Sequence, residues 1–338
     1  MRSPAACLVL GLAVCAFGPA HAQDGTPRAD LAAQLTGHQP ALPVLSDLGA
    51  DADALAVYQV PEERFTINLG PADVRRMHTQ REVVFPSAIK TRWPEVHGTL
   101  YAPRHAQPGD RIPAAVVVHH LGGSFEVEAY MAQFLAQHGI MAFFISLPNY
   151  GNRQEPGTSQ GFISARDPLN APNGFRQAVL DVIRAGDLLR AMPEVDSERV
   201  GVLGVSLGSF VCSVARGVDP RLRRSVLILG GGDLGSVVRT ADEVREVLDK
   251  SGVDPEELAE ALLPYDPITF AGRVPTEDVL MINASQDEVV PPSSTRALWH
   301  AFGEPEIHWF ATGHYGMALH IPWVMTRALD HLRGRTAH

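Results

Sequence analysis

The most informative stretch of this sequence is Gly204-Val205-Ser206-Leu207-Gly208. It follows an apolar run, 199–203, that predicts a strand, and it precedes a segment, 209–217, that predicts a helix. A G-x-S-x-G motif between a strand and a helix forms a turn so tight that the serine backbone is strained and side chains in place of the two glycines would clash. Such a turn holds the serine hydroxyl out at the sheet edge, above the helix N-terminus. The motif therefore makes Ser206 a candidate nucleophile.

A nucleophilic serine needs a general base, and that base needs an acid to orient it. With this motif the expected chain order is serine, then acid, then histidine. The predicted strand 278–284 ends in a loop that carries Asp287, and the short predicted strand 306–310 is followed by a glycine-flanked loop that carries His314. Catalytic groups collect at the carboxyl ends of strands in α/β sheets. We therefore predict Asp287 as the orienting acid and His314 as the base.

Other residues compete for both roles. Asp233 follows the preceding predicted strand, Glu288 stands next to Asp287, and an aspartate in such a loop is often only a helix cap. The chain has 14 histidines, so a histidine alone is a weak signal. His308 lies within a predicted strand and His320 within a predicted helix, positions more typical of structural histidines.

Acyl transfer to a serine also needs two backbone N–H groups that bind the developing oxyanion. One is expected from Leu207, the residue after the nucleophile. The other is expected from the loop His119-His120-Leu121-Gly122-Gly123-Ser124, which follows the apolar strand 114–118, and its predicted donor is the amide of Leu121. The alternative for this loop is a plain Gly-Gly turn before a helix. Tyr150 follows another predicted strand on the same side, and either contacts substrate or packs within its turn.

Taken together, these features resemble the α/β-hydrolase superfamily over about residues 95–334. The segment 196–201, the loop 287–291 and Gly313-His314 are similar to the dienelactone hydrolase, acetyl xylan esterase and prolyl-oligopeptidase-like branches. The resemblance implies an α/β-hydrolase fold with a mostly parallel central sheet flanked by helices. Dienelactone hydrolases carry a cysteine nucleophile, so Ser206 favours ordinary ester chemistry. Lipases and cutinases typically have histidine before the serine. This chain has Val205 there, which argues against a lipase.

The expected function is therefore a serine hydrolase that cleaves a carboxylic ester of a small molecule through an acyl-enzyme. We expect no cofactor and no metal, because the sequence contains no P-loop, H-E-x-x-H, EF-hand loop or paired C-x-x-C. One alternative is a prolyl-oligopeptidase-like peptidase or amidase with the same triad. About 90 residues between the predicted leader and the core leave no room for that group's N-terminal propeller. The other alternative is a catalytically silent hydrolase fold that binds a ligand.

Residues 1–22 predict a cleavable signal peptide, with Arg2, an apolar core at 5–17 and an Ala20-His21-Ala22 cleavage site. This core is too short to span a membrane. The expected location is therefore periplasmic or secreted. Cys7 and Cys15 would leave with the leader, so the mature chain would keep Cys212 alone, as a small buried residue.

The formal charge of −10 becomes −11 without Arg2, which argues against nucleic acid and anionic membranes as partners. Residues 23–52 read as an N-terminal tail or linker, and 53–338 as one α/β-hydrolase domain that opens with antiparallel strands. A helical insertion is expected at about 233–277, after the sixth strand, either as a cap over the active site or as helices packed to one side. The sequence does not indicate the oligomeric state.

Overall fold

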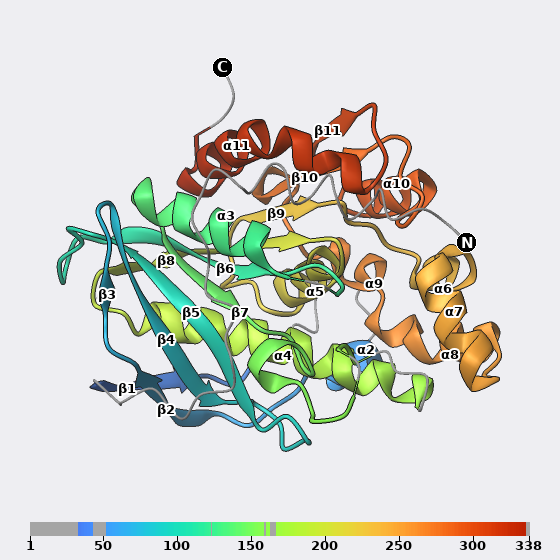
Figure 1. Ribbon diagram of the computed structural model, residues 1–338, viewed down its shortest axis with the longest axis horizontal. Helices are drawn as coiled ribbons and strands as arrows, with labels where there is room; N and C mark the ends of the chain where they lie inside the picture. Colours follow the sequence, from blue (N-terminus) through green and yellow to red (C-terminus); the bar gives the residue numbers. More distant parts are fainter. Residues whose placement is uncertain (1–32, 43–51, 123, 159, 163–166, 336–338) are drawn as a thin grey trace.

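An eleven-stranded sheet runs through the computed structural model, with helices on both of its faces (Figure 1). The structure describes residues 33–42, 52–122, 124–158, 160–162 and 167–335, so the predicted signal peptide lies outside the described residues. The strands are β1 (Ala33–Gln39), β2 (Glu63–Leu69), β3 (Asp73–Val74), β4 (His78–Pro86), β5 (Glu95–Pro103), β6 (Ile112–Val118), β7 (Met141–Ile145), β8 (Val195–Val205), β9 (Ser225–Ile228), β10 (Val279–Ala284) and β11 (Glu306–Phe310).

Apart from α2 (Ala52–Ala56), which lies between β1 and β2, the α-helices follow β6 and stand between or after the later strands. These later helices are α3 (Glu126–Gln137), α4 (Ala171–Arg190), α5 (Leu207–Val218), α6 (Leu234–Thr240), α7 (Asp242–Ser251), α8 (Pro255–Leu262), α9 (Pro267–Ala271), α10 (Pro292–Ala301) and α11 (Ile321–Arg333). Short 3-10 helices are η1 (Gly151–Arg153), η2 (Pro168–Asn170), η3 (Leu263–Tyr265), η4 (Thr276–Asp278) and η5 (Tyr315–His320). Among the described residues, no helix has both the length and the apolar character that crossing a membrane requires.

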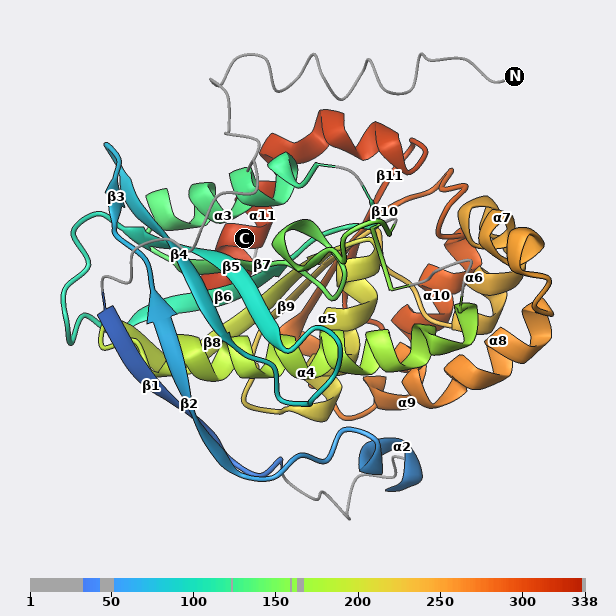
Figure 2. The same cartoon turned by 60° about the horizontal axis from the view of Figure 1, so that its bottom comes forward.

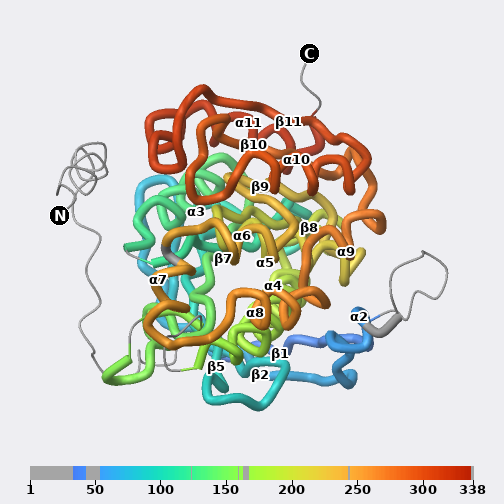
Figure 3. The backbone as a smooth tube through the Cα atoms, turned by 90° about the vertical axis from the view of Figure 1, so that its right-hand side faces the viewer, coloured from blue at the N-terminus to red at the C-terminus, as the bar shows by residue number. Residues whose placement is uncertain are grey.

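The strand order confirms the predicted architecture. Along the sheet it reads β1-β2-β4-β5-β7-β6-β8-β9-β10-β11, with β3 paired to β4. The pairs from β7 to β11 are parallel, and the strands before them pair antiparallel. In Figure 3, β1 and β2 lie at one end of the molecule and β10 and β11 at the other. Residue Val118 at the end of β6 pairs with Gly204 of β8, which places the loop after β6 beside the G-x-S-x-G turn.

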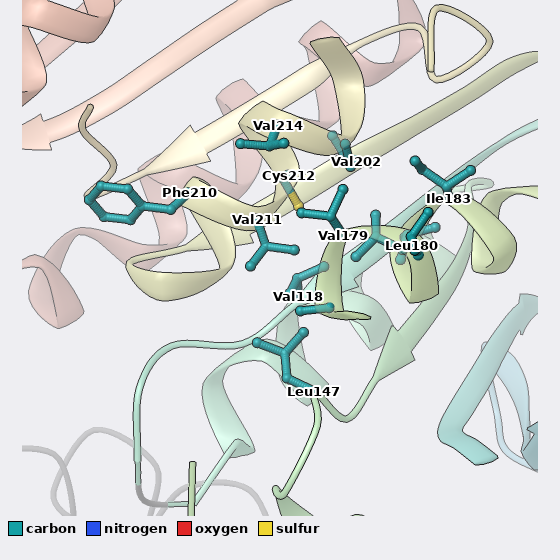
Figure 4. Packing of buried hydrophobic residues seen from close by; sticks show 14 of the residues in the cluster. Val118, Leu147, Val179, Leu180, Ile183, Val202, Phe210, Val211, Cys212 and Val214 are labelled. Atoms are coloured by element: carbon teal, nitrogen blue, oxygen red, sulfur yellow. The ribbon is translucent and has the colours of Figure 1, made fainter. Parts of the chain in front are cut away.

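The sheet separates two hydrophobic cores, because successive residues of a strand point to opposite faces. Val116 and Val118 of β6 belong to the core with α4 and α5, whereas Ala115 and Val117 belong to the core with α3 and α11. Figure 2 shows α4 and the pair α3 and α11 on opposite sides of the sheet. Figure 4 shows Cys212 of α5 among valines, leucines and isoleucines of the first core, as the sequence predicts for this fully buried residue.

The interpretation of residues 23–52 as a tail is wrong for 33–39, which form β1 and pair antiparallel with β2. The sequence gives little indication of strand β1, because most of its side chains are exposed and no apolar pattern marks it. Contacts with distant residues stabilise the strand instead. The buried Arg184 donates from Nε to Gln39 Oε1 at 2.7 Å, and the Phe65 ring covers Gly37 so closely that a Cβ there would lie 2.4 Å from it. Local propensity does not reveal such a strand.

The helical insertion at about 233–277 is confirmed as helical, and it contains α6 to α9. Figure 1 shows α6, α7 and α8 at the edge of the molecule opposite β3. The insertion packs against α5 and α10, and near η2. Phe270 of α9, for example, lies so close to Gly217 of α5 that a Cβ on this glycine would come within 2.5 Å. The structure therefore favours helices packed to one side.

Candidate active site

The G-x-S-x-G stretch forms the strained turn that its sequence predicts. Ser206 has φ 52° and ψ −115°, a region that non-glycine residues rarely occupy, and its N–H donates to Ile228 O at 2.8 Å. A Cβ on Gly204 would lie 2.3 Å from Gly208 O, and a Cβ on Gly208 would lie 2.3 Å from Val118 O. Since no side chain fits at that distance, both positions require glycine. The strain is maintained because the strands and the helix around the turn fix its ends.

The helix after the turn is anchored directly to the sheet. Helix α5 begins at Leu207, and the buried Ser209 hydroxyl lies 2.7 Å from both Gly204 O and Ile228 O. The first N–H groups of a helix have no acceptor within the helix, so those that find no other partner are available to an anion. In α5 the N–H of Ser209 is already bonded to Ser206 O at 2.8 Å. The Leu207 amide is another N–H group of this first turn. This position suits its predicted role as an oxyanion donor, which stays a prediction.

Asp287 and His314, 27 residues apart in sequence, meet at the carboxyl ends of β10 and β11. His314 Nδ1 lies 2.9 Å from Asp287 Oδ1 and 2.8 Å from Oδ2. Both side chains are nearly buried. Asp287 Oδ1 also accepts the N–H groups of Val289 at 2.9 Å and Val290 at 2.8 Å. The carboxylate is therefore held by its own loop while it orients the imidazole. With Nδ1 facing Asp287, Nε2 is the ring nitrogen left to exchange a proton.

Ser206 and His314 line one hollow of about 170 Å³ at the carboxyl edge of the sheet. Its other walls come from the loop after β6, from α3, from the end of β9 and from η5 and α11. Leu121 of the predicted oxyanion loop is among the lining residues, and none of the residues 233–277 is. The structure thus brings the predicted nucleophile, base and oxyanion loop to one cavity, and it leaves the helical insertion outside.

The competing candidates occupy structural positions. Asp233 caps α6, where its Oδ1 accepts the N–H of Ser236 at 3.0 Å. Glu288 Oε2 accepts the backbone N–H of His314 at 3.4 Å. His308 pairs with Glu306 at 2.6 Å, and His320 packs against Phe310. None of these four side chains contacts the His314 ring, so Asp287 remains the acid that the geometry favours.

Two buried side chains fix the loop that carries Leu121. His119 is fully buried, and its Nδ1–H donates to His120 O at 2.7 Å while its Nε2 accepts the N–H of Leu147 at 3.0 Å. Glu128 of α3 is also fully buried, and its Oε1 accepts the N–H of His120 at 3.2 Å. Both polar groups of His120's backbone are thereby held just before the Leu121 amide. The choice of that amide as the second oxyanion donor stays a prediction.

Sequence reasoning missed the pair formed by His120 and Glu128. His120 Nδ1 lies 2.6 Å from Glu128 Oε1, on the wall of the hollow that contains Ser206. Burial opposes protonation of His120, but the hydrogen bond and the negative charge of Glu128 outweigh it and raise the pKa of His120. The only signal in the sequence is an acidic residue in the first turn of a helix, which is also an ordinary complement to the helix dipole.

Tyr150 does not have the position that substrate contact requires. Its side chain is fully buried and is absent from the lining of the Ser206 hollow. The ring packs edge-on against His119, with centroids 4.7 Å apart, and lies 5.9 Å from Phe125. The structure therefore corrects the hypothesis of a substrate-binding Tyr150. Of the two roles expected for this residue, packing is the one observed, behind the loop that carries Leu121.

We expect His119 to make the protein sensitive to acid. Burial lowers the pKa of His119 from 6.5 to about 4, so the native state resists the proton that the unfolded chain accepts. This contribution to stability is complete above about pH 6.5 and is lost as the pH falls towards 4. The shift corresponds to roughly 3 kcal/mol of unfolding free energy. Denaturant unfolding at several pH values between 7.5 and 4.5 measures how steeply the free energy of unfolding falls with pH.

The variant His119→Gln keeps an amide donor and an acceptor but has no group that titrates in this range. Its free energy of unfolding is expected to be lower at pH 7.5, with a flatter decline towards pH 4.5. Replacement of the exposed His105 by glutamine is the matched control and should leave the slope as in the parent protein. An unchanged slope in His119→Gln would contradict the assignment of acid sensitivity to this residue.

Within the part of the chain that the structure describes, no cluster of three or more His, Cys, Asp or Glu side chains has a metal-binding arrangement. A larger hollow of about 530 Å³ lies between the loop after β4 and the start of α4, where Lys90, Arg92 and Asp167 contribute to its walls. It shares no residue with the hollow that contains Ser206.

Residues 96–314 match the sequence profile of the dienelactone hydrolase family. Among curated proteins, an uncharacterised protein of Mycobacterium tuberculosis is 26% identical over 178 residues, which cover 50% of this chain and 41% of that protein. An uncharacterised protein of Bacillus subtilis is 30% identical over 76 residues, or 22% of this chain and 66% of that protein. The chain thus spans less than half of the length of the mycobacterial relative.

Solved structures resemble the chain over most of its length. An acetyl xylan esterase from a Paenibacillus species has a TM-score of 0.67 and 24% identity, covering 82% of this chain and 92% of its own. An acetyl xylan esterase from a Thermoanaerobacterium species has a TM-score of 0.58 and 22% identity, covering 77% and 87%. A cold-adapted esterase from an Arctic intertidal metagenomic library has a TM-score of 0.52 and 18% identity, covering 79% and 98%. At these identities they establish the fold, and the predicted α/β-hydrolase architecture is confirmed.

Proposed function

The chain belongs to the dienelactone hydrolase family, and we propose that it cleaves a carboxylic ester of a small molecule, with Ser206 as the nucleophile where dienelactone hydrolases carry cysteine. The observation that carries the proposal is the contact of His314 Nδ1 with both Asp287 oxygens, beside a hollow that His314 and the strained Ser206 both line. Nucleophile, base and orienting acid in this arrangement are the components of a catalytic triad. The esterases with the same fold support the same reaction class.

In the proposed reaction, Ser206 Oγ attacks the ester carbonyl while His314 Nε2 takes its proton. The amides of Leu207 and Leu121 bind the oxyanion of the tetrahedral intermediate. Protonated His314 gives the proton to the departing alcohol, which leaves an acyl group on Ser206. A water molecule, deprotonated by His314, then releases the acid. Asp287 keeps the imidazole in the tautomer that both halves need and stabilises the imidazolium.

Burst kinetics on p-nitrophenyl acetate and butyrate, followed by stopped flow, test this proposal. We expect about one equivalent of p-nitrophenol per protein in the first turnover, since an acyl-enzyme forms before it is hydrolysed. A fluorophosphonate probe should label the parent protein and leave Ser206→Ala unlabelled. The p-nitroanilides of the same acids test amide cleavage and should react far more slowly. Folded protein that neither bursts nor takes the probe would point to a ligand-binding hydrolase fold instead.

We further propose that the protein is exported and that residues 1–22 are removed after Ala22. The support is Arg2, the apolar stretch 5–17 and the Ala20-His21-Ala22 site. Edman sequencing of the exported protein checks the cleavage site, and an N-terminus other than Gln23 would contradict it.

A further inference from the structure

The hollow beside Ser206 is mainly apolar. Eleven of its sixteen lining residues are valine, leucine, isoleucine, methionine or alanine. Of the remaining side chains, Ser206 and His314 belong to the proposed triad. His120 and Glu128 are paired with each other at 2.6 Å. The fifth, Tyr315, is exposed at the mouth. Apart from the proposed triad, the wall inside the mouth therefore presents little hydrogen-bonding capacity to a bound group. A group rich in hydroxyls would lose its water there without full compensation, which disfavours a sugar ring inside this hollow.

The hollow extends from Ser206 into the core between the sheet and helices α3 and α11. Met131 of α3 and Val324 of α11 line it, and both are almost completely buried members of that core. Figure 1 shows these two helices on the same side of the sheet. At the mouth, the side chains of Leu121 and Tyr315 are partly exposed, by 39% and 52%. An apolar group that enters past these two residues thus moves from water to an apolar surface.

The volume of the hollow beside Ser206 limits the size of the group that it can hold. An apolar cavity of about 150 Å³ in a protein core is large enough for benzene. The hollow beside Ser206 has a volume of about 170 Å³, so it accommodates about six carbon atoms. An acetyl group, with two carbon atoms, would leave most of that volume unfilled.

We propose that this hollow is the subsite for an apolar group of about six carbon atoms attached to the scissile ester. The inference rests on the proposed function, and it narrows the substrate class to esters that carry such a group. Burial of each methylene is expected to raise kcat/KM about fourfold until the hollow is full. From two to six carbon atoms the gain should reach roughly 250-fold, and then level off.

Two substrate series tell which side of the ester occupies the hollow. The first varies the acyl chain of p-nitrophenyl esters from acetate to decanoate, and the second varies the alcohol of alkyl acetates from ethyl to decyl. A rise to about six carbons in the first series places the acyl chain in the hollow, and a rise in the second places the alcohol there. Either result supports the inference. Serine-dependent turnover with no rise in either series would overturn it while leaving the ester hydrolase intact, and no burst on any ester would remove the proposed function itself.

The variant Ala318→Phe tests the location. Ala318 lines the hollow and is only partly buried, so a larger side chain can project into the cavity without disrupting the core. We expect the ratio of kcat/KM on p-nitrophenyl hexanoate to kcat/KM on the acetate to fall at least tenfold in this variant. Leu319→Phe is the matched control, since Leu319 is 69% exposed and does not line the hollow. Equal preference for hexanoate in Ala318→Phe and in the control would overturn the assignment of this hollow.

Discussion

Ser206→Ala is expected to lower kcat for ester hydrolysis by roughly four to six orders of magnitude. The change removes the only atom that can form the proposed acyl-enzyme. It leaves the turn intact, because alanine adds no atom beyond Cβ and the backbone N–H of Ser206 still reaches Ile228 O. His314→Ala should cost a similar factor, since without it no base accepts the proton. Steady-state kinetics on p-nitrophenyl butyrate measures both, with burst amplitude as a second readout.

The double variant distinguishes a triad from two independent contributions. If Ser206 and His314 act as one unit, removing both should cost no more than removing either one alone. Ser213→Ala is the matched control in the same helix, because its hydroxyl is also buried and donates only to Ser209 O at 2.7 Å. It should leave kcat within a few fold of the parent. If the two losses multiplied in the double variant, Ser206 and His314 would act independently and not as one unit. Near-parental activity in either single variant would show that the replaced residue is not catalytic.

The sequence predicts the parts of the site that depend on local backbone geometry. A turn in which Gly204 and Gly208 meet backbone atoms at 2.3 Å accepts only glycine, so its pattern is visible in the sequence. Asp287 and His314 are likewise readable, because each follows a strand, and the carboxyl ends of parallel strands share one edge of the sheet. Asp287 and His314 therefore come into contact because the two strands that precede them are parallel neighbours in the sheet.

The sequence does not reveal features that depend on distant tertiary contacts. Strand β1 is stabilised by a buried arginine 145 residues further along the chain, and nothing within 33–39 announces it. Glu128 stands in the first turn of a helix, where acidic residues commonly complement the helix dipole, but it is fully buried against His120. Tyr150 follows a strand on the expected side, but its ring packs against His119 and Phe125, behind the loop that carries Leu121. In each of these three cases, the position of the residue or strand depends on which distant segment of the chain packs against it.

Asp287→Asn should lower kcat by about four orders of magnitude with little effect on folding. Asparagine keeps an oxygen to accept the N–H groups of Val289 and Val290, so the loop is preserved. Its NH2 group, however, would donate to His314 Nδ1. The imidazole would then carry its proton on Nε2, where it could not accept one from Ser206. Steady-state kinetics with thermal unfolding separates the loss of catalysis from any loss of stability.

Asp233→Asn is the matched control, because Asp233 is the other acid that follows a strand of this sheet. Its side-chain oxygen caps α6, and asparagine is as good a helix cap as aspartate. We expect kcat of Asp233→Asn to stay within a few fold of the parent, since its carboxylate makes no contact with His314. If the two variants exchanged these effects, the orienting acid would be Asp233. The His314 imidazole would then have to leave its present partner, at 2.8 Å, before catalysis. The contact of His314 with both Asp287 oxygens therefore favours Asp287.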